Sequence, residues 1–239
     1  MNGRQRGSRA VGSAFAAAVI AATQLVGSGA HGATAAAAVS SPVGGRAATA
    51  GYEVSNHDQK VALYTAMRKL WSDHMHWTYA TVDAFFHNRA ALQPTLDRLL
   101  QNQREIGGSF EPFYGPAAAN RLTDLLLTHI KLAVPVLQAA QAGDQARLRD
   151  AMAAWYANAR QIADFLTKLN PRNWPRSATR PIMREHITQT KVYSVDLLKG
   201  DYKKSITDFE LALRHMLKLS DILAGGIIAQ FPDRFRASS

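Results

Sequence analysis

From Ser55 onward, apolar residues recur every three to four positions, and no segment of this body shows the alternating pattern of a β-strand. The first apolar stripe predicts a helix that begins at the Ser55 and Asn56 caps and runs to about Phe86. The inward face of this helix comprises Leu63, Met67, Leu70, His74, Trp77, Thr81 and Phe85. The pattern therefore predicts a helical body.

Five further helices are predicted, over about 94–105, 116–141, 145–169, 181–199 and 202–230. Glycine, proline and capping residues separate them, namely Gly107, Gly108, Pro112 and Gly115, the turn Ala142-Gly143-Asp144, Asn170-Pro171 and Gly200-Asp201. Long helices joined by short turns pack as antiparallel neighbours. The predicted fold class is all-α, an up-and-down antiparallel bundle of four to five long helices plus one short helix, in one domain over 55–235.

The residues before this body have a different composition. Residues 1–51 contain 9 of the 16 glycines and four arginines but no acidic residue, and the first carboxylate is Glu53. A basic start, a short apolar stretch over 11–26 and a small-residue exit predict a signal peptide over 1–37, followed by a flexible linker over 38–54. The protein is thus expected to be secreted or extracytoplasmic, with no transmembrane anchor after cleavage. A disordered basic tail is the alternative.

The charge and composition exclude several classes of protein. The chain has no cysteine, which excludes disulfide scaffolds, thiolate metal sites and cysteine nucleophiles. Its net charge is +10, and without the four arginines of residues 1–51 it holds 24 basic against 18 acidic residues, or +6. Arg172, Arg176, Arg180 and Arg184 form a local basic group, which is either a solvated face or a contact for an anionic cell-wall polymer, nucleic acid or phospholipid. Because stacking aromatics do not recur beside it, no nucleic acid partner is expected.

Most motifs that carry enzyme chemistry are missing from the sequence. There is no GxxxxGK[ST] loop, and the one GxGxxG match, over 27–32, lies within the predicted signal peptide, so no nucleotide cofactor is predicted. HExxH, paired ExxH, HxxxE and GxSxG motifs are also missing. The sequence leaves open whether the protein is an enzyme, and a hydrolase that uses histidines as acid and base would lack a recognisable nucleophile.

Three histidines carry the remaining candidate chemistry. His74, His129 and His186 each fall on the apolar stripe of a different predicted helix. On the last helix, Glu210 lies within the predicted inward face of Ile206, Leu213 and Leu217, and Asp221 continues that face. Helical bundles build metal sites from inward side chains of facing helices. The sequence therefore predicts a transition-metal site, for Zn, Fe or Cu, formed by His74, His129 and His186 with Glu210 or Asp221 completing the shell.

Two other interpretations remain open. Each histidine can instead be a core residue that is hydrogen-bonded to a threonine, a tyrosine, an asparagine or a backbone carbonyl, and Thr78, Thr190, Tyr156 and Asn158 are available for this. The protein can also be a non-enzymatic interaction module of the cell envelope that uses its basic surface. The partner is not identified by the sequence, beyond the metal ion.

Several short segments carry a resemblance to a known group. They are Leu70-Trp71-Ser72-Asp73-His74 with Trp77-Thr78, Arg98-Leu99-Leu100-Gln101-Asn102, Phe113-Tyr114-Gly115, His129, Ala142-Gly143-Asp144, Trp155-Tyr156-Ala157-Asn158-Ala159, Leu169-Asn170-Pro171, Glu185-His186 and Gln230-Phe231-Pro232. Together they resemble a family of small bacterial helical proteins over about 60–235. The resemblance implies a helical fold and no particular activity. The chain departs from the family pattern at Tyr79, where an arginine is expected, and at Ser205, where an acidic residue is expected.

Overall fold

The computed structural model describes residues 56–236, and within this range every regular element is a helix. The elements are α2 (Asn56–His87), α3 (Arg89–Gly108), α4 (Glu111–Ala142), α5 (Gln145–Leu169), α6 (Arg176–Lys199), α7 (Tyr202–Gln230) and the short 3-10 helix η1 (Pro232–Phe235). The predicted signal peptide over 1–37 and the linker over 38–54 lie outside the described residues.

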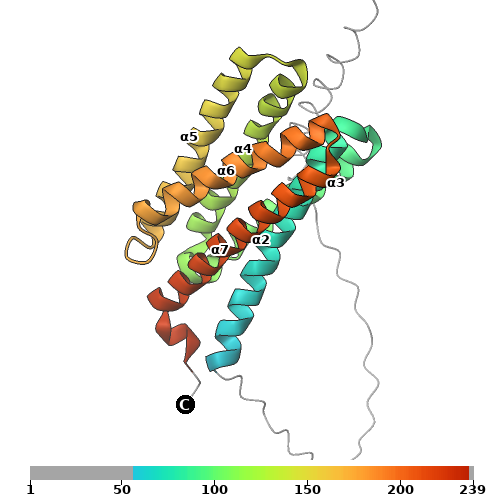
Figure 1. The fold of residues 1–239 in the computed structure, drawn as a ribbon. Coiled ribbons are helices and arrows are strands. Elements are labelled where there is room, and N and C mark those ends of the chain that lie inside the picture. The colour runs from blue at the N-terminus through green and yellow to red at the C-terminus, as the bar shows by residue number, and fades with distance from the viewer. Residues whose placement is uncertain (1–55, 237–239) are drawn as a thin grey trace, which may run out of the picture.

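The helices run up and down and form one bundle (Figure 1). From α2 to α7, each pair of consecutive helices packs together, and α7 returns to pack along α2. This closes the bundle, and α6 also reaches α2 and α4 across the middle. The predicted all-α antiparallel bundle is confirmed.

Local sequence signals set several of the helix ends where they were predicted. Asp144 caps α5, with its side chain accepting a hydrogen bond from the Arg147 amide at 3.0 Å. Gly143 and Gly200 end α4 and α6 with φ of 68° and 72°, a left-handed conformation that favours glycine. These caps explain why the predicted bounds of α5 and α7 match the observed ones.

Two helices are longer than the sequence indicates. Helix α3 begins at Arg89, capped by the Asn88 side chain, and holds Pro94 inside it, whereas the predicted helix begins at Pro94. Helix α6 begins at Arg176 and contains Pro181, where the prediction places its start. Both errors have one cause, since each prediction begins the helix at its proline, whereas the helix continues on the N-terminal side of that proline.

Helix α4 has two features that matter for the bundle. Its backbone leaves helical geometry at Gly115, with φ 79° and ψ 168°, so the regular helix begins at Pro116 as predicted. By length and composition, α4 is the one described helix that is apolar enough to cross a membrane. It packs between α3 and α5, and core helices of bundles pass the same test.

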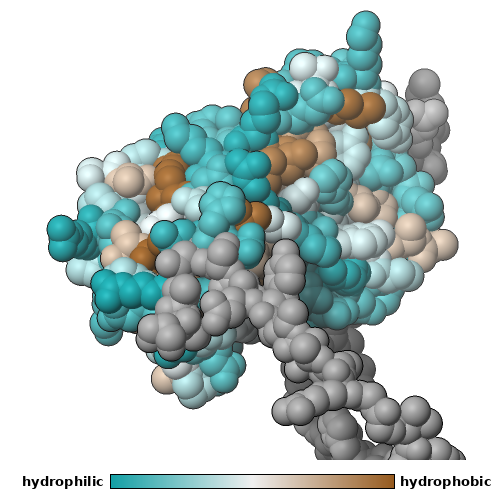
Figure 2. All heavy atoms as spheres, turned by 90° about the horizontal axis from the view of Figure 1, so that it is seen from below, coloured by the Kyte–Doolittle hydropathy of each residue, from teal (hydrophilic) through white to brown (hydrophobic). Residues whose placement is uncertain are grey.

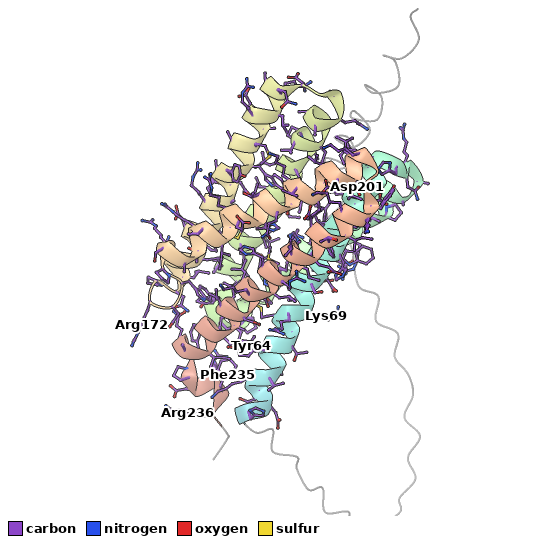
Figure 3. The ribbon with its side chains drawn as sticks, viewed as in Figure 1. Tyr64, Lys69, Arg172, Asp201, Phe235 and Arg236 are labelled. Atoms are coloured by element: carbon purple, nitrogen blue, oxygen red, sulfur yellow. The ribbon has the colours of Figure 1, made fainter. Side chains whose placement is uncertain are left out.

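The bundle's apolar side chains gather between the helices, and its charged side chains project outward. Arg172 extends from the loop between α5 and α6, and Asp201 lies at the opposite end of the bundle (Figure 3). Seen from below, the surface is mainly hydrophilic, with small separate groups of apolar residues (Figure 2). The large apolar residues that stay exposed are Val61, Val192, Tyr202, Ile206 and Leu211.

Gly107 fixes how closely α3 approaches α4. A Cβ atom at this position would lie 1.9 Å from Thr123 Oγ1 and 3.0 Å from the Ala119 carbonyl oxygen. At the next residue, Gly108, nothing lies within 4 Å of a Cβ atom. The sequence interprets both glycines as helix breakers, whereas the structure requires the first one for helix packing.

We therefore expect Gly107→Ala to lower the free energy of unfolding by about 1–3 kcal/mol, because the added methyl group overpacks the α3–α4 contact. Gly108→Ala is the matched control and should change stability by less than about 1 kcal/mol. Urea denaturation followed by circular dichroism measures both. Equal effects of the two substitutions would contradict a packing role for Gly107.

Candidate functional site

Three buried imidazoles meet in the middle of the bundle. His74 of α2, His129 of α4 and His186 of α6 are 2%, 3% and 3% exposed. The His186 ring centre lies 5.6 Å from that of His74 and 5.6 Å from that of His129. The structure thus brings together the three histidines that the sequence predicts to be inward-facing.

Neighbouring side chains hold the backbone and the rings of two of these histidines. The Thr78 hydroxyl donates to the His74 carbonyl at 2.6 Å, and the Trp155 indole Nε1–H donates to the His129 carbonyl at 3.0 Å. Trp71 meets the His74 ring edge-on, and Trp155 lies against the His129 ring at 5.3 Å between ring centres. The tryptophans therefore restrict how the imidazoles can turn.

Asn158 fixes the tautomer of His129. Its Nδ2 donates to the Leu125 carbonyl at 3.2 Å, so its Oδ1 is the acceptor toward His129 Nδ1 at 2.9 Å. The His129 proton then sits on Nδ1, which leaves a lone pair on Nε2. An imidazole whose far nitrogen donates to an amide oxygen in this way has the outer hydrogen bond typical of metal-ligating histidines.

Gln103 contacts His74 in the opposite sense. Its Nε2 lies 3.1 Å from His74 Nδ1 and also donates to the Leu99 carbonyl at 3.0 Å and to Asn102 Oδ1 at 3.2 Å, while its Oε1 has no hydrogen-bond partner among the described residues. These two acceptors fix the orientation of the amide, so Nε2 donates to His74 Nδ1 and the His74 proton sits on Nε2.

His186 lacks such a partner. Within residues 56–236 its Nδ1 is buried and makes no hydrogen bond. Leaving a buried polar group unpaired costs about 1–3 kcal/mol. Buried polar atoms of native proteins are normally paired with protein, water or a ligand, so this nitrogen marks a place where a ligand would be stabilised.

Burial keeps all three imidazoles neutral at pH 7. Desolvation lowers the pKa of His74 to about 3 and that of His129 to about 4. Desolvation also lowers the pKa of His186 well below its usual value, and the nearby histidines lower it further. Because the rings are neutral, their lone pairs are available without first losing a proton.

A cavity of about 50 Å³ lies beside the three rings. Its other polar lining comes from Thr78, Thr81, Thr190, Ser194 and Lys191, and the rest of its wall is apolar, formed largely by α4 together with side chains of α2, α3, α5 and α6. This volume exceeds the space of about 10–15 Å³ that one water molecule needs, by the same measure. The imidazoles therefore border a space that is large enough for a water molecule or a small ligand but has an almost entirely apolar surface.

Neither predicted carboxylate joins the histidines. The Glu210 side chain is 61% exposed and lies 3.9 Å from Arg214, and Asp221 makes a 2.6 Å ion pair with Arg68. Neither residue lines the cavity. Among residues 56–236, no three histidine or carboxylate groups lie close enough, as their side chains stand, to hold a metal ion.

The error for the carboxylates comes from the register of α7. The sequence interpretation places Ile206 on the inward face, but Ile206 is 53% exposed. The buried stripe instead includes Ser205, Ala212, Met216, Leu219 and Leu223, most of it offset from the predicted face by one or two positions. One position rotates a helical side chain by about 100°, which is enough to turn Glu210 toward solvent.

Tyr79 and Ser205 lie against each other. Ser205 is fully buried, and its Oγ lies 3.1 Å from the Tyr79 hydroxyl and 3.3 Å from the Tyr193 carbonyl. Two neutral hydroxyl groups therefore pair between α2 and α7, and this contact buries no charge.

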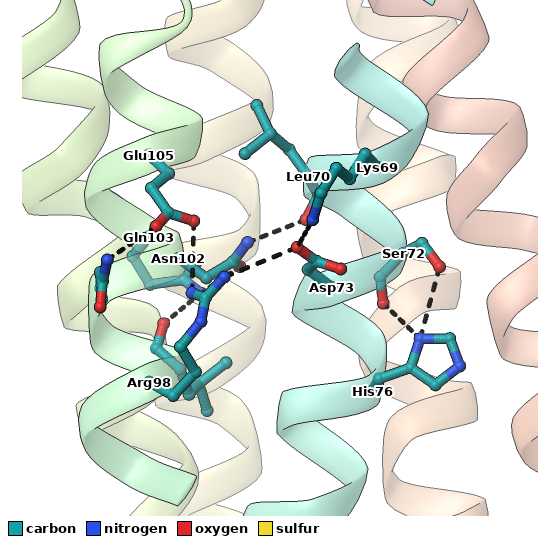
Figure 4. Close-up of polar contacts among 11 residues, drawn as sticks. Lys69, Leu70, Ser72, Asp73, His76, Arg98, Asn102, Gln103 and Glu105 are labelled. Atoms are coloured by element: carbon teal, nitrogen blue, oxygen red, sulfur yellow. Dashed lines mark hydrogen bonds and ion pairs between the residues drawn. The ribbon is translucent and has the colours of Figure 1, made fainter. Parts of the chain in front are cut away.

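A polar network that includes Asp73, Arg98, Asn102 and Glu105 links α2 to α3 (Figure 4). Arg98 forms ion pairs with Asp73 at 3.6 Å and Glu105 at 3.2 Å. The Asn102 amide also joins the two helices, because it donates to the Leu70 carbonyl at 3.0 Å.

The sequence does not identify Gln103 as a partner of His74, because a glutamine at a helical position carries no distinctive spacing signal.

Comparisons with protein-family models, with curated proteins and with solved structures find no match to this chain. The class defined by the fold and the site is an all-α bundle with a buried cluster of three imidazoles.

The lowered pKa values make stability depend on pH in a defined window. Between about pH 6.5 and 4, these histidines bind protons in the unfolded chain but not in the folded bundle. Each histidine therefore lowers the free energy of unfolding by up to about 1.4 kcal/mol for each pH unit by which the pH falls. We expect the free energy of unfolding to be level above about pH 7 and to drop by up to about 4 kcal/mol per pH unit below pH 6. The hydrogen bond from Arg180 also lowers the pKa of Asp164. This shift changes the free energy of unfolding only below the ordinary aspartate pKa of 3.8, which is below the pH range of the histidine effect.

Urea titrations at several pH values between 4.5 and 8 measure this slope. The substitution His186→Leu should reduce it by about a third, because one of three equivalent proton sites is lost. A slope that is the same in the variant and the native protein would show that His186 takes up protons in the folded state.

Proposed function

We propose that this protein binds a transition-metal ion in the bundle core through His74, His129 and His186, and that it does so outside the cytoplasm. The observation that carries the metal proposal is that three neutral imidazoles lie close together in the core. The ring centres of His74 and His129 each lie 5.6 Å from that of His186. The basic and apolar pattern of residues 1–37 supports the proposal of export.

Two of the three ring separations suit a three-histidine centre. A Zn–N bond of about 2.0–2.1 Å puts each ring centre about 3.2 Å from the metal, and ligand angles between tetrahedral and trigonal then separate ring centres by about 5–5.5 Å. The separations of His74 and of His129 from His186, both 5.6 Å, lie close to this range. Binding requires the rings to turn so that their nitrogens point to a common centre, and it requires His74 and His129 to approach each other to the same distance.

The donor set also favours a metal over a purely structural role. The His129 Nδ1–H donates to the Asn158 amide oxygen, which leaves Nε2 free for a metal, whereas His74 Nδ1 accepts from Gln103. The unpaired Nδ1 of His186 is unfavourable in the absence of a ligand. A metal bond to His186 would remove this cost, while hydrogen bonds to core residues alone leave it in place.

With no carboxylate at the cluster, the fourth position of such a centre faces the cavity of about 50 Å³. Three imidazoles and one open position are a ligand set that Zn²⁺ and Cu²⁺ accept, and iron accepts imidazole as well. In this proposal the apolar wall restricts the open position to water or another small ligand.

Elemental analysis tests the proposal on untagged protein beginning at residue 38 and purified without chelators. We expect near-stoichiometric metal, or stoichiometric uptake of added Zn²⁺ or Cu²⁺ by isothermal titration calorimetry, and loss of both in the His74→Ala/His129→Ala/His186→Ala variant. His57→Ala/His76→Ala is the control, since these two histidines are exposed. Uptake that survives the triple substitution, or no uptake by the native protein, would contradict the proposal.

His186→Leu separates loss of binding from loss of folding. Removing an unpaired buried nitrogen should leave the metal-free protein equally stable or more stable by about 1 kcal/mol. The same variant should bind metal at least tenfold more weakly. A large loss of stability in the metal-free variant would instead assign His186 a structural role.

A further inference from the structure

A second hollow lies on the outside of the bundle, between α5 and α6, away from the imidazole cluster. Its volume is about 260 Å³, and its lining consists of Tyr156, Ala159, Arg160, Arg180, Pro181 and Arg184. Three of these six residues are arginines, and all three are exposed. This concentration of guanidinium groups around one hollow needs an explanation.

The antiparallel pairing of α5 and α6 builds the hollow from residues far apart in sequence. Tyr156 and Arg160 are one turn apart on α5, and Arg180 and Arg184 are one turn apart on α6. The small, buried Ala159 lies between the two rows and leaves room above it. The basic group that the sequence shows at Arg172, Arg176, Arg180 and Arg184 thus becomes part of a concave site together with Arg160.

Some of the arginines are held in place. Arg180 makes two hydrogen bonds to Asp164, each 2.8 Å, and Arg176 approaches the same carboxylate at 3.2 Å. The Arg184 guanidinium lies 5.2 Å from the centre of the Tyr156 ring, and the Tyr156 hydroxyl lies 3.0 Å from Thr188 Oγ1. The side chains on the two helices are therefore positioned before any ligand arrives.

The positive charge of the hollow is only partly balanced. No carboxylate lines it among the described residues, and its neighbour Asp164 is shared by Arg176 and Arg180. Around it, four arginines face one carboxylate, an excess of three positive charges. Like charges gathered in one place repel each other, and a bound anion would relieve that repulsion.

We propose that this hollow, which we name the arginine pocket, binds a phosphate group, either as free phosphate or as a phosphodiester. The planar fork of a guanidinium matches two phosphate oxygens, and a tetrahedral anion offers oxygens to several such forks at once. Arg160 and Arg184 supply the main contacts, while Arg180 is oriented by Asp164. This site is independent of the metal proposal, because its side chains face outward from α5 and α6.

Nuclear magnetic resonance tests the site with inorganic phosphate, added to the full chain in chloride buffer at constant ionic strength. We expect saturable shifts of the Arg160 and Arg184 side-chain Nε–H signals. Arg160→Gln/Arg184→Gln should weaken binding at least about tenfold, since each lost charge-assisted contact contributes about that factor. Arg184→Lys, which keeps the charge but loses the fork, should give an intermediate loss.

Arg121→Gln/Lys131→Gln is the matched control, with the same change of charge on exposed residues of α4. A second arm replaces phosphate with vesicles of phosphatidylglycerol or of phosphatidylcholine. Saturation by phosphate alone identifies a free phosphate site. Binding only to phosphatidylglycerol vesicles, lost in the Arg160/Arg184 variant and kept in the control, identifies a headgroup site.

Two results would overturn the proposal. One is the lack of any saturable response to phosphate and to phosphatidylglycerol. The other is an equal loss of binding in the Arg160/Arg184 variant and the α4 control, which would reduce the effect to general charge attraction. Metal content is unaffected by either substitution, so failure of this proposal leaves the metal proposal standing.

Discussion

The central constraint on this bundle is that three imidazoles share an apolar core. Desolvation drives His74, His129 and His186 to their neutral forms, which removes the repulsion that would otherwise push α2, α4 and α6 apart. Neutral imidazoles in an apolar core still need hydrogen-bond partners for their ring nitrogens. Gln103 and Asn158 each contact one ring, whereas Nδ1 of His186 makes no hydrogen bond within residues 56–236. The cluster is thus a polar centre that the protein fold supports incompletely, which is the condition that favours a ligand.

The helices, and most of their ends, could be predicted from the sequence because their signals are local. Asp144, Gly143 and Gly200 act through their own backbone and the next turn, so they can be identified without knowledge of the packing. The inward positions of the three histidines could also be predicted, since each falls within a long apolar stripe. The role of Gly107 could not, because the atom that excludes a side chain there belongs to Thr123 on another helix.

The carboxylates show where periodicity fails. Helix α7 has apolar residues on more than one face, so its pattern does not define a single inward direction, and Glu210 and Asp221 lie outside the core. Their actual partners, Arg214 and Arg68, are surface cations. Tyr79 and Ser205 illustrate a further limit, because two residues that are 126 positions apart in the sequence make one contact only when α2 and α7 are packed. Pairings between helices are thus the part of the site that a single sequence does not reveal.

The central claim is that the imidazole cluster is a metal-binding centre. Its most direct test is a long-range ¹H–¹⁵N correlation spectrum of the histidine rings during titration with Zn²⁺. The account predicts that the signals of His74, His129 and His186 change together and are complete at one equivalent, with Nδ1 of His129 still protonated. Shifts confined to exposed histidines such as His76, or a cluster that stays unchanged in excess Zn²⁺, would contradict it.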